Sequence, residues 1–284
     1  ATQAKRQPGS TFKLFVYLAA LRAGMTPDSM IADTPINDGL YRPKNSGGTY
    51  RGDITLRQAF ARSSNVASVR LYNQVGGKSV ARAASDLGIG SPLTLDPSLA
   101  LGSSGVTLLE LTSAYAGVAA NEWPVVAHAF KQEEQGWIEW LFSGPRSFSG
   151  RTHNMLLDLL GATVKDGTGR AARLSIPAYG KTGTSQDNRD ALFIGFAGDL
   201  VVGVWIGNDN NTPLRGVNGG GLPARIWADF MAQSIKGAGR KAAPKPVNIP
   251  DPEGPIEPLD LPELPDIPIN IDGTDVRINE KDGV

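Results

Sequence analysis

Apolar and polar positions along the chain form patterns that predict both helices and strands. Residues 14–21 are apolar on all sides of a helix, which is typical of a central buried helix rather than of a surface helix. Two apolar runs at 191–198 and 201–207 surround a short turn and are typical of paired strands. Further helices are predicted at 54–61, 66–74, 78–87, 107–119, 151–164 and 223–235, and a strand pair at 125–130 and 137–142.

Two of the predicted helices begin with a capping box, a pair of side chains that bond reciprocally to the first backbone amides. Thr55 is followed three residues later by Gln58, and Thr107 by Glu110. Before the first of these helices lies a long connection, residues 24–53, which is rich in Pro, Gly, Asn and Asp. Loops of this length tend to be functional or mobile, so we expect this one to line a cleft.

The composition changes from residue 238 onward. Nine of the twenty prolines fall between Pro244 and Pro268, with acidic residues between them. Such a segment cannot bury enough apolar area to offset the cost of ordering the chain. We therefore predict a main domain at 1–237 and a disordered or extended polyproline-type tail at 238–284. The spaced prolines could also bind a partner's groove, but the linker interpretation is favoured.

Composition excludes several classes of function. The 284 residues are 40% hydrophobic and 20% charged, enough for one sizeable core, and the net charge of zero gives no indication of nucleic-acid binding. The absence of cysteine excludes thiol catalysis and cysteine-ligated zinc. His128 and His153 lack metal-ligand spacing and are interpreted as structural, so no metal or cofactor is expected. No apolar run is long enough to predict a membrane segment in this chain.

Candidate chemistry begins near the N-terminus, where Ser10 and Lys13 follow a Pro8-Gly9 turn signal. Positions i and i+3 share one helix face, so the two side chains would lie side by side. Burial disfavours the charged ammonium, and a neutral Lys13 could accept the hydroxyl proton of Ser10 as a general base. By itself this spacing arises by chance roughly once in a chain of this length.

Two further elements strengthen the pattern. Lys181-Thr182-Gly183 is a much rarer triplet, and the strand-like runs that follow it predict that Lys181 lies on a sheet edge. Ser63 and Asn65 follow a short predicted helix, and they can face one substrate only if that segment is irregular. An alternative of equal weight is that Asn65 merely caps the next helix.

In order and spacing these elements resemble the penicillin-recognising serine transpeptidases. The segments 6–13, 166–170, 180–191 and 202–209 are similar to class A, bifunctional penicillin-binding proteins, and the resemblance covers about residues 1–236. It implies an α+β fold in which an antiparallel sheet has helices on both faces and the active site lies between the sheet and a mostly helical lobe.

In that family, strands, a glycosyltransferase domain and a membrane anchor precede the nucleophile. Only nine residues precede Ser10 here, so we expect an N-terminally truncated domain whose first strands are missing. The resemblance places it at the periplasmic or extracytoplasmic face of the bacterial inner membrane, anchored by an upstream segment. Its expected partners are peptidoglycan stem peptides ending in D-Ala-D-Ala, β-lactam antibiotics, an upstream glycosyltransferase domain and cell-wall synthesis proteins.

The resemblance also implies a role for each motif residue. Ser10 would be the acylated nucleophile and Lys13 its base. Ser63 would relay a proton toward the leaving amine, and Asn65 would bond to the amide of the substrate. Lys181 would supply positive charge near the relay.

The remaining implied roles concern the binding of the substrate. Thr182 and Thr184 would hold the terminal carboxylate of a stem peptide or a penicillin. The backbone amides of Ser10 and Thr184 would form the oxyanion hole. Gly183 would let a substrate strand approach the sheet edge closely.

The implied activity is D,D-transpeptidation through an acyl-serine intermediate. The alternatives are a D-alanyl-D-alanine carboxypeptidase and a non-catalytic β-lactam sensor. A β-lactamase would need a second base to activate water. Glu110 is the candidate for that base, but its capping box predicts that it is engaged at a helix start.

Overall fold

The computed structural model describes residues 2–37, 41–128, 144 and 146–236, and the backbone of two short strands near the C-terminus. Contacts divide the chain into two units, Ala1–Pro246 and Val247–Val284. In the second unit the described strands are β8 (Ile269–Ile271) and β9 (Thr274–Val276), which pair antiparallel. The rest of the predicted tail lies outside the described residues, so its disorder stays a prediction.

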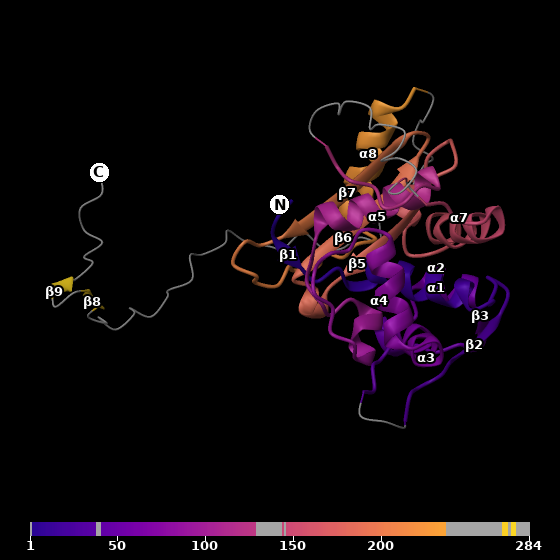
Figure 1. Cartoon of the computed structure of the whole chain (residues 1–284), viewed down its shortest axis with the longest axis horizontal. Helices are drawn as coiled ribbons and strands as arrows, with labels where there is room; N and C mark the ends of the chain where they lie inside the picture. The colour runs from indigo at the N-terminus through magenta and orange to yellow at the C-terminus, as the bar shows by residue number, and fades with distance from the viewer. Residues whose placement is uncertain are drawn as a thin grey trace. The chain divides into compact units, whose positions relative to one another are not determined.

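A three-stranded antiparallel sheet forms the centre of the first unit (Figure 1). Its strands are β5 (Tyr179–Thr184), β6 (Asp190–Ala197) and β7 (Leu200–Gly207), in the order β5-β6-β7. The predicted strand pair is therefore confirmed. Strand β5 is an edge strand among the described residues, which confirms the expected place of Lys181.

Helices cover both faces of this sheet. Successive side chains of a strand point to opposite faces, so Leu192 and Ile194 of β6 join a different apolar cluster from Phe193. Helix α5 (Leu108–Ala120) packs on the first face, and α8 (Leu222–Ser234) packs on the second, where Trp227 Nε1 donates to Gly195 O at 3.2 Å. This arrangement confirms the α+β class.

The predicted central helix is α1 (Lys13–Arg22), and residues 14–21 are all buried. Around it lie α2 (Leu56–Arg62), α3 (Asn65–Val75), α4 (Gly77–Asp86) and α7 (Gly150–Lys165). Both predicted capping boxes are present, at the starts of α2 and α5. Helix α8 has a proline in its first turn, as predicted from Pro223.

The connection at 24–53 is not the unstructured loop that its composition predicts. It contains β2 (Met30–Asp33), which pairs antiparallel with β3 (Gly52–Thr55). Ile54 belongs to β3 and not to the following helix, because it pairs with Ile31 and both side chains are buried. A second short pair joins β1 (Lys5–Arg6) to β4 (Val106–Thr107).

The strand pair predicted at 125–130 and 137–142 lies largely outside the described residues. Residues 125–128 are described and form no strand, so the strand-like context expected for His128 is wrong. Nearby, Trp123 and Arg146 form an isolated antiparallel bridge.

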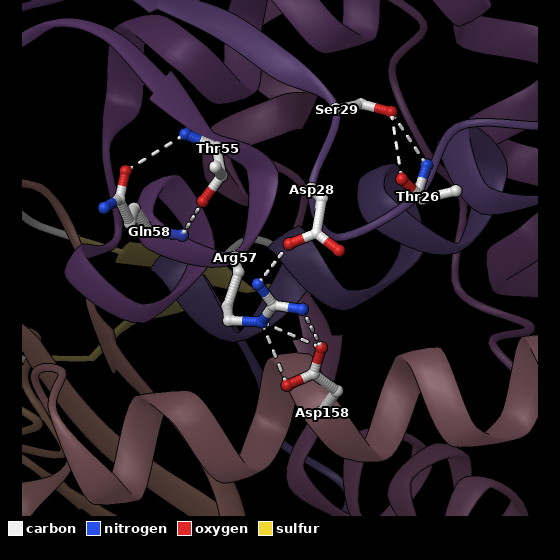
Figure 2. A network of polar contacts seen from close by, with 7 residues as sticks. All are labelled: Thr26, Asp28, Ser29, Thr55, Arg57, Gln58 and Asp158. Carbon is white, nitrogen blue, oxygen red and sulfur yellow. Dashed lines mark hydrogen bonds and ion pairs between the residues drawn. The ribbon is translucent and has the colours of Figure 1, made fainter.

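Polar contacts of Arg57 tie α2 to its neighbours (Figure 2). The guanidinium binds both carboxylate oxygens of Asp158 on α7 and one oxygen of Asp28 in the loop before β2. All three groups are partly exposed, so the network contributes little stability, but its forked geometry orients α2 against α7. Among the helices of the described residues, none combines the length and apolar character needed to cross a bilayer.

Candidate active site

The Ser10 turn is pressed against the end of strand β5. Residues Gly9–Phe12 form one 3₁₀ turn that leads directly into α1. Gly9 has φ +53°, and a Cβ there would lie 2.4 Å from Thr184 O. On the other side, a Cβ on Gly102 would lie 2.2 Å from Gly9 O. Only glycine allows these backbones to meet, and their contact places half-buried Ser10 beside Thr184.

Lys13 lies fully buried at the start of α1. Its Nζ donates to Ser63 O at 2.7 Å, to Asn65 Oδ1 at 2.8 Å and to Ser63 Oγ at 3.2 Å. Burial, helped by the charge of Lys181, holds the pKa of Lys13 well below its usual value. The predicted desolvation of this amine is therefore confirmed.

A second buried amine contacts the same hydroxyl. Lys181 Nζ donates to Ser63 Oγ at 2.9 Å and to Thr182 O at 3.3 Å, and it lies 5.5 Å from the centroid of the Phe60 ring. Burial lowers the pKa of Lys181 to about 7. Ser63 Oγ thus lies within hydrogen-bond distance of two amines that lose their protons more readily than ordinary lysines do.

The segment from Ser63 to Asn65 is irregular, as convergence on one substrate requires. Ser63 ends α2 in the left-handed conformation, with φ 59° and ψ 40°. Ser64 caps α3, since its side chain accepts from Ala67 N at 3.1 Å. The alternative that Asn65 is the cap is therefore wrong: Asn65 is the first helical residue, and its Oδ1 faces Lys13.

The threonines of β5 bond to groups from other segments. Thr182 Oγ1 lies 2.6 Å from Thr168 Oγ1, and Thr184 Oγ1 accepts from Gly219 N at 3.1 Å. A hydroxyl that accepts one hydrogen bond still has its own proton to donate, for example to a carboxylate.

Gly183 is required by the protein itself. A Cβ at this position would lie 2.5 Å from Pro8 O and 2.8 Å from Thr11 Cγ2. The glycine thus lets the Ser10 turn approach β5. The approach of a substrate strand, which the family resemblance implies for Gly183, stays a prediction.

The remaining candidates have structural contacts. His153 Nε2 lies 2.8 Å from Val118 O. The carboxylate of Glu110 accepts from the backbone amides of Gly90, Ser91 and Thr107 and from the hydroxyls of Ser91 and Thr107. Burial works to raise the pKa of Glu110, but these hydrogen bonds outweigh it and lower the pKa. Such a carboxylate is a weak base held at the start of α5, as its capping box predicted.

The structure thus joins Ser63, Asn65, Lys13 and Lys181 by hydrogen bonds, and it packs Gly9, the residue before Ser10, against Thr184. Sequence reasoning gave no individual role to four residues around the site. Phe60 contacts Lys181, and Asn45 contacts Asn65. Thr168 contacts Thr182, and Asp33 contacts Ser64 and Asn45. Thr168 lies in segment 166–170, which carried part of the family resemblance, and that was its only signal. The other three lie in segments whose pattern indicated only helix, strand or loop.

Comparison with known proteins identifies the family of this chain. The family model of the penicillin binding protein transpeptidase domain matches residues 1–232, so the chain belongs to this family. Penicillin-binding protein 1A of Neisseria lactamica is 37% identical over 266 residues, which cover 87% of this chain and 33% of that protein. The protein of the same name from Rickettsia typhi is 33% identical over 270 residues, covering 83% and 34%. The resemblance to class A penicillin-binding proteins is confirmed, and the chain spans about a third of the length of these relatives.

Solved structures show the same fold. The crystal structure of penicillin-binding protein 1A from Haemophilus influenzae superposes with a TM-score of 0.70 at 25% identity, covering 86% of this chain and 45% of that chain. PonA1 from Mycobacterium tuberculosis, solved in complex with penicillin V, gives a TM-score of 0.68 at 24% identity, covering 86% and 73%. At that identity the second likeness shows the fold alone.

Proposed function

We propose that this domain is a serine D,D-transpeptidase that cross-links peptidoglycan stem peptides through an acyl-Ser10 intermediate. The observation that carries the proposal is the position of Ser63 Oγ, 3.2 Å from Lys13 Nζ and 2.9 Å from Lys181 Nζ, in a cluster next to the Ser10 turn. A hydroxyl between two buried amines is suited to carry protons to and from a leaving or attacking amine.

Acylation begins with Lys13. In its neutral form the amine has two N–H donors, so it releases one of its three contacts, and its lone pair takes the proton of Ser10 Oγ. The oxygen then attacks the carbonyl carbon of the penultimate D-Ala. The backbone amides of Ser10 and Thr184 stabilise the resulting oxyanion, and one such donor is worth about a hundredfold to a thousandfold in rate. The contact between Gly9 and Thr184 O supports this pairing, because it holds the two residues together before substrate arrives.

The second half of the reaction uses Ser63. When the tetrahedral intermediate collapses, the peptide C–N bond breaks and the leaving D-Ala amine takes a proton from Ser63 Oγ, which is resupplied by a neighbouring lysine. An acceptor amine then attacks the ester carbon and returns its proton by the same route. Two amines at hydrogen-bond distance from one hydroxyl support this two-way transfer.

Substrate binding relies on the edge strand β5. The hydroxyls of Thr182 and Thr184 would donate to the terminal carboxylate of the stem peptide, near the charge of Lys181. Asn65 would bond to the substrate amide with the Nδ2 proton that its bond to Lys44 O leaves unused. A β-lactam with a carboxylate beside its ring would bind in the same way and acylate Ser10.

The proposal extends to the setting of the protein. We infer that it works at the periplasmic or extracytoplasmic face of the inner membrane, anchored upstream and joined to a glycosyltransferase domain. The match to proteins three times as long supports this inference.

The proposal is tested with a donor peptide ending in D-Ala-D-Ala and an amine acceptor, with products separated by mass. A cross-linked product supports the transpeptidase. Release of D-Ala with water alone indicates the carboxypeptidase, and no turnover in a protein that still binds penicillin indicates the sensor. Ser63→Ala should slow turnover while leaving the fold intact, and exposed Ser46→Ala is the matched control.

A β-lactamase is disfavoured by the contacts of Glu110. Its carboxylate is engaged by five donors at the start of α5, so it is not poised to activate water against the ester. Rapid steady-state hydrolysis of a chromogenic β-lactam would contradict this conclusion.

A further inference from the structure

Two side chains outside the sequence motifs hold the start of helix α3. Asn45, in the connection between β2 and β3, accepts with Oδ1 from Asn65 N at 2.8 Å and from Val66 N at 3.2 Å. These two amides have no partner within the helix, so Asn45 caps α3 from another segment. Asn65 therefore has its backbone fixed by a residue 20 positions earlier in the chain.

The amide of Asn45 is itself held by a buried carboxylate. Its Nδ2 donates to Asp33 Oδ1 at 2.7 Å and to Thr49 O at 3.0 Å. Asp33 is 3% exposed and also accepts from Ser64 Oγ at 2.6 Å and from Arg51 N at 3.1 Å. A carboxylate this deeply buried is stable only with such donors, which fixes the orientation of the Asn45 amide.

The same connection sets the side chain of Asn65. Lys44 O, one residue before Asn45, accepts from Asn65 Nδ2 at 2.8 Å. With Nδ2 bound there, Asn65 Oδ1 points to Lys13 Nζ, 2.8 Å away. A flipped amide would place a donor against a donor at Lys13 and an acceptor against an acceptor at Lys44. Asn45 and its neighbour thus control both the backbone and the amide of Asn65.

We propose that Asp33 and Asn45 are positioning residues for acylation: the pair holds Asn65 so that its side-chain oxygen meets Lys13 in the geometry observed. The inference rests on the proposed function. A residue that acted only through stability would change the melting temperature but would not require Asn65 for its effect on rate.

The test uses Asn45→Asp, which keeps the shape and the capping oxygen but sets two carboxylates against each other. The acylation rate constant and the dissociation constant of the initial complex are measured with a fluorescent penicillin, at a temperature where circular dichroism shows each variant folded. We expect the rate constant to fall about tenfold or more. Asp53→Asn, on the exposed face of the same strand pair, is the control and should stay within about twofold.

A double-mutant cycle distinguishes positioning from general destabilisation. In an Asn65→Ala background, Asn45→Asp should cost no more than about twofold, because the group it positions is gone. The double variant Asp33→Asn, Asn45→Asp exchanges the two side chains and again sets a donor against an acceptor. Its acylation rate constant should be at least about threefold higher than that of Asn45→Asp alone.

Several results would overturn the inference. Asn45→Asp could acylate as fast as the parent, or its loss could be equally large without Asn65. If Asn45→Asp does not fold, the double variant Asp33→Asn, Asn45→Asp is compared with Asn65→Ala instead. A folded double variant that acylates no faster than Asn65→Ala would also overturn the inference. Failure of the parent itself to acylate at Ser10 would count against the proposed function instead.

Discussion

At the scale of residues, the site depends on two lysines that are kept from water. Lys13 and Lys181 are fully buried, and both bond to the hydroxyl of Ser63. Burial lowers the pKa of both amines, and the charge of Lys181 lowers the pKa of Lys13 further. We infer that Lys13 can act as a base at a pH where an ordinary lysine is protonated.

Lys13→Arg should abolish rapid acylation although it retains a cation. Arginine does not lose its proton in proteins and cannot accept the proton of Ser10. We expect the rate of penicillin acylation to fall by far more than tenfold. A tenfold fall alone corresponds to about 1.4 kcal/mol in the barrier. Lys78→Arg, at an exposed position of α4, is the control and should leave the rate unchanged. A Lys13→Arg protein that reacts within tenfold of the parent would show that Lys13 is not the base.

The burial of Lys181 should be visible in the pH dependence of stability. The pKa of Lys181 is about 7 in the folded protein, whereas the ordinary lysine value of 10.5 applies to the unfolded chain. Between these two pH values the unfolded chain therefore binds more protons. The free energy of unfolding should therefore rise with pH from about 7 upward, by at most about 1.4 kcal/mol per pH unit from this group. Lys181→Met should flatten the rise in a series of denaturant titrations, and an unchanged slope would show that Lys181 is not desolvated.

The sequence indicated the candidate site residues but not the residues that contact and hold them. Ser10, Lys13 and Lys181 have chemistry that their spacing makes visible. Asn45 and Asp33 reach Asn65 and Ser64 only through the fold, and a polar residue in a loop carries no local sign of such a contact. The roles of the supporting residues could therefore be found only from the structure.

At the scale of elements, close backbone contacts join three segments. Gly9 fits between Thr184 and Gly102, and Gly183 fits against Pro8. The sequence showed these glycines but not their partners, because the contacts join residues far apart in the chain.

Gly9→Ala should destabilise the fold by more than the strain of a positive φ alone would. The φ of +53° strains any side chain, and the added Cβ would also meet Thr184 O at 2.4 Å. We expect a loss of about 3 kcal/mol in the free energy of unfolding, together with slower acylation. Gly24→Ala has the same kind of strain, with φ +92°, but no atom within 4 Å of the new Cβ, and should cost only about 1 kcal/mol. Equal effects in chemical denaturation would contradict the contact between Gly9 and β5.

Helices were easier to predict than short strands. Capping boxes and long apolar runs marked α1 and α5 to within one residue at each end and α2 to within two. Strands β2 and β3 have four residues each. So few residues show little alternation of apolar and polar side chains, and the Gly and Pro of the surrounding connection favour a loop. Their pairing is set by the burial of Ile31 and Ile54 in the tertiary structure.

At the scale of the whole molecule, the candidate site residues all belong to the unit Ala1–Pro246. Every group placed in the site lies within it, and the family match ends at residue 232. Deletion of residues 247–284 should therefore leave the acylation rate within about twofold and the melting temperature nearly unchanged. Thermal melts of the two proteins check this, and a drop of several degrees in the shorter one would show that the last unit stabilises the first.

The most direct test of the account is the site of penicillin attachment. The folded chain is incubated with a penicillin, and its intact mass and peptide map are recorded over time. We predict one adduct, on the peptide that contains Ser10, which persists for minutes or longer and is absent in Ser10→Ala. An adduct on another residue, or none on a chain that is demonstrably folded, would contradict the assignment of Ser10 as the nucleophile.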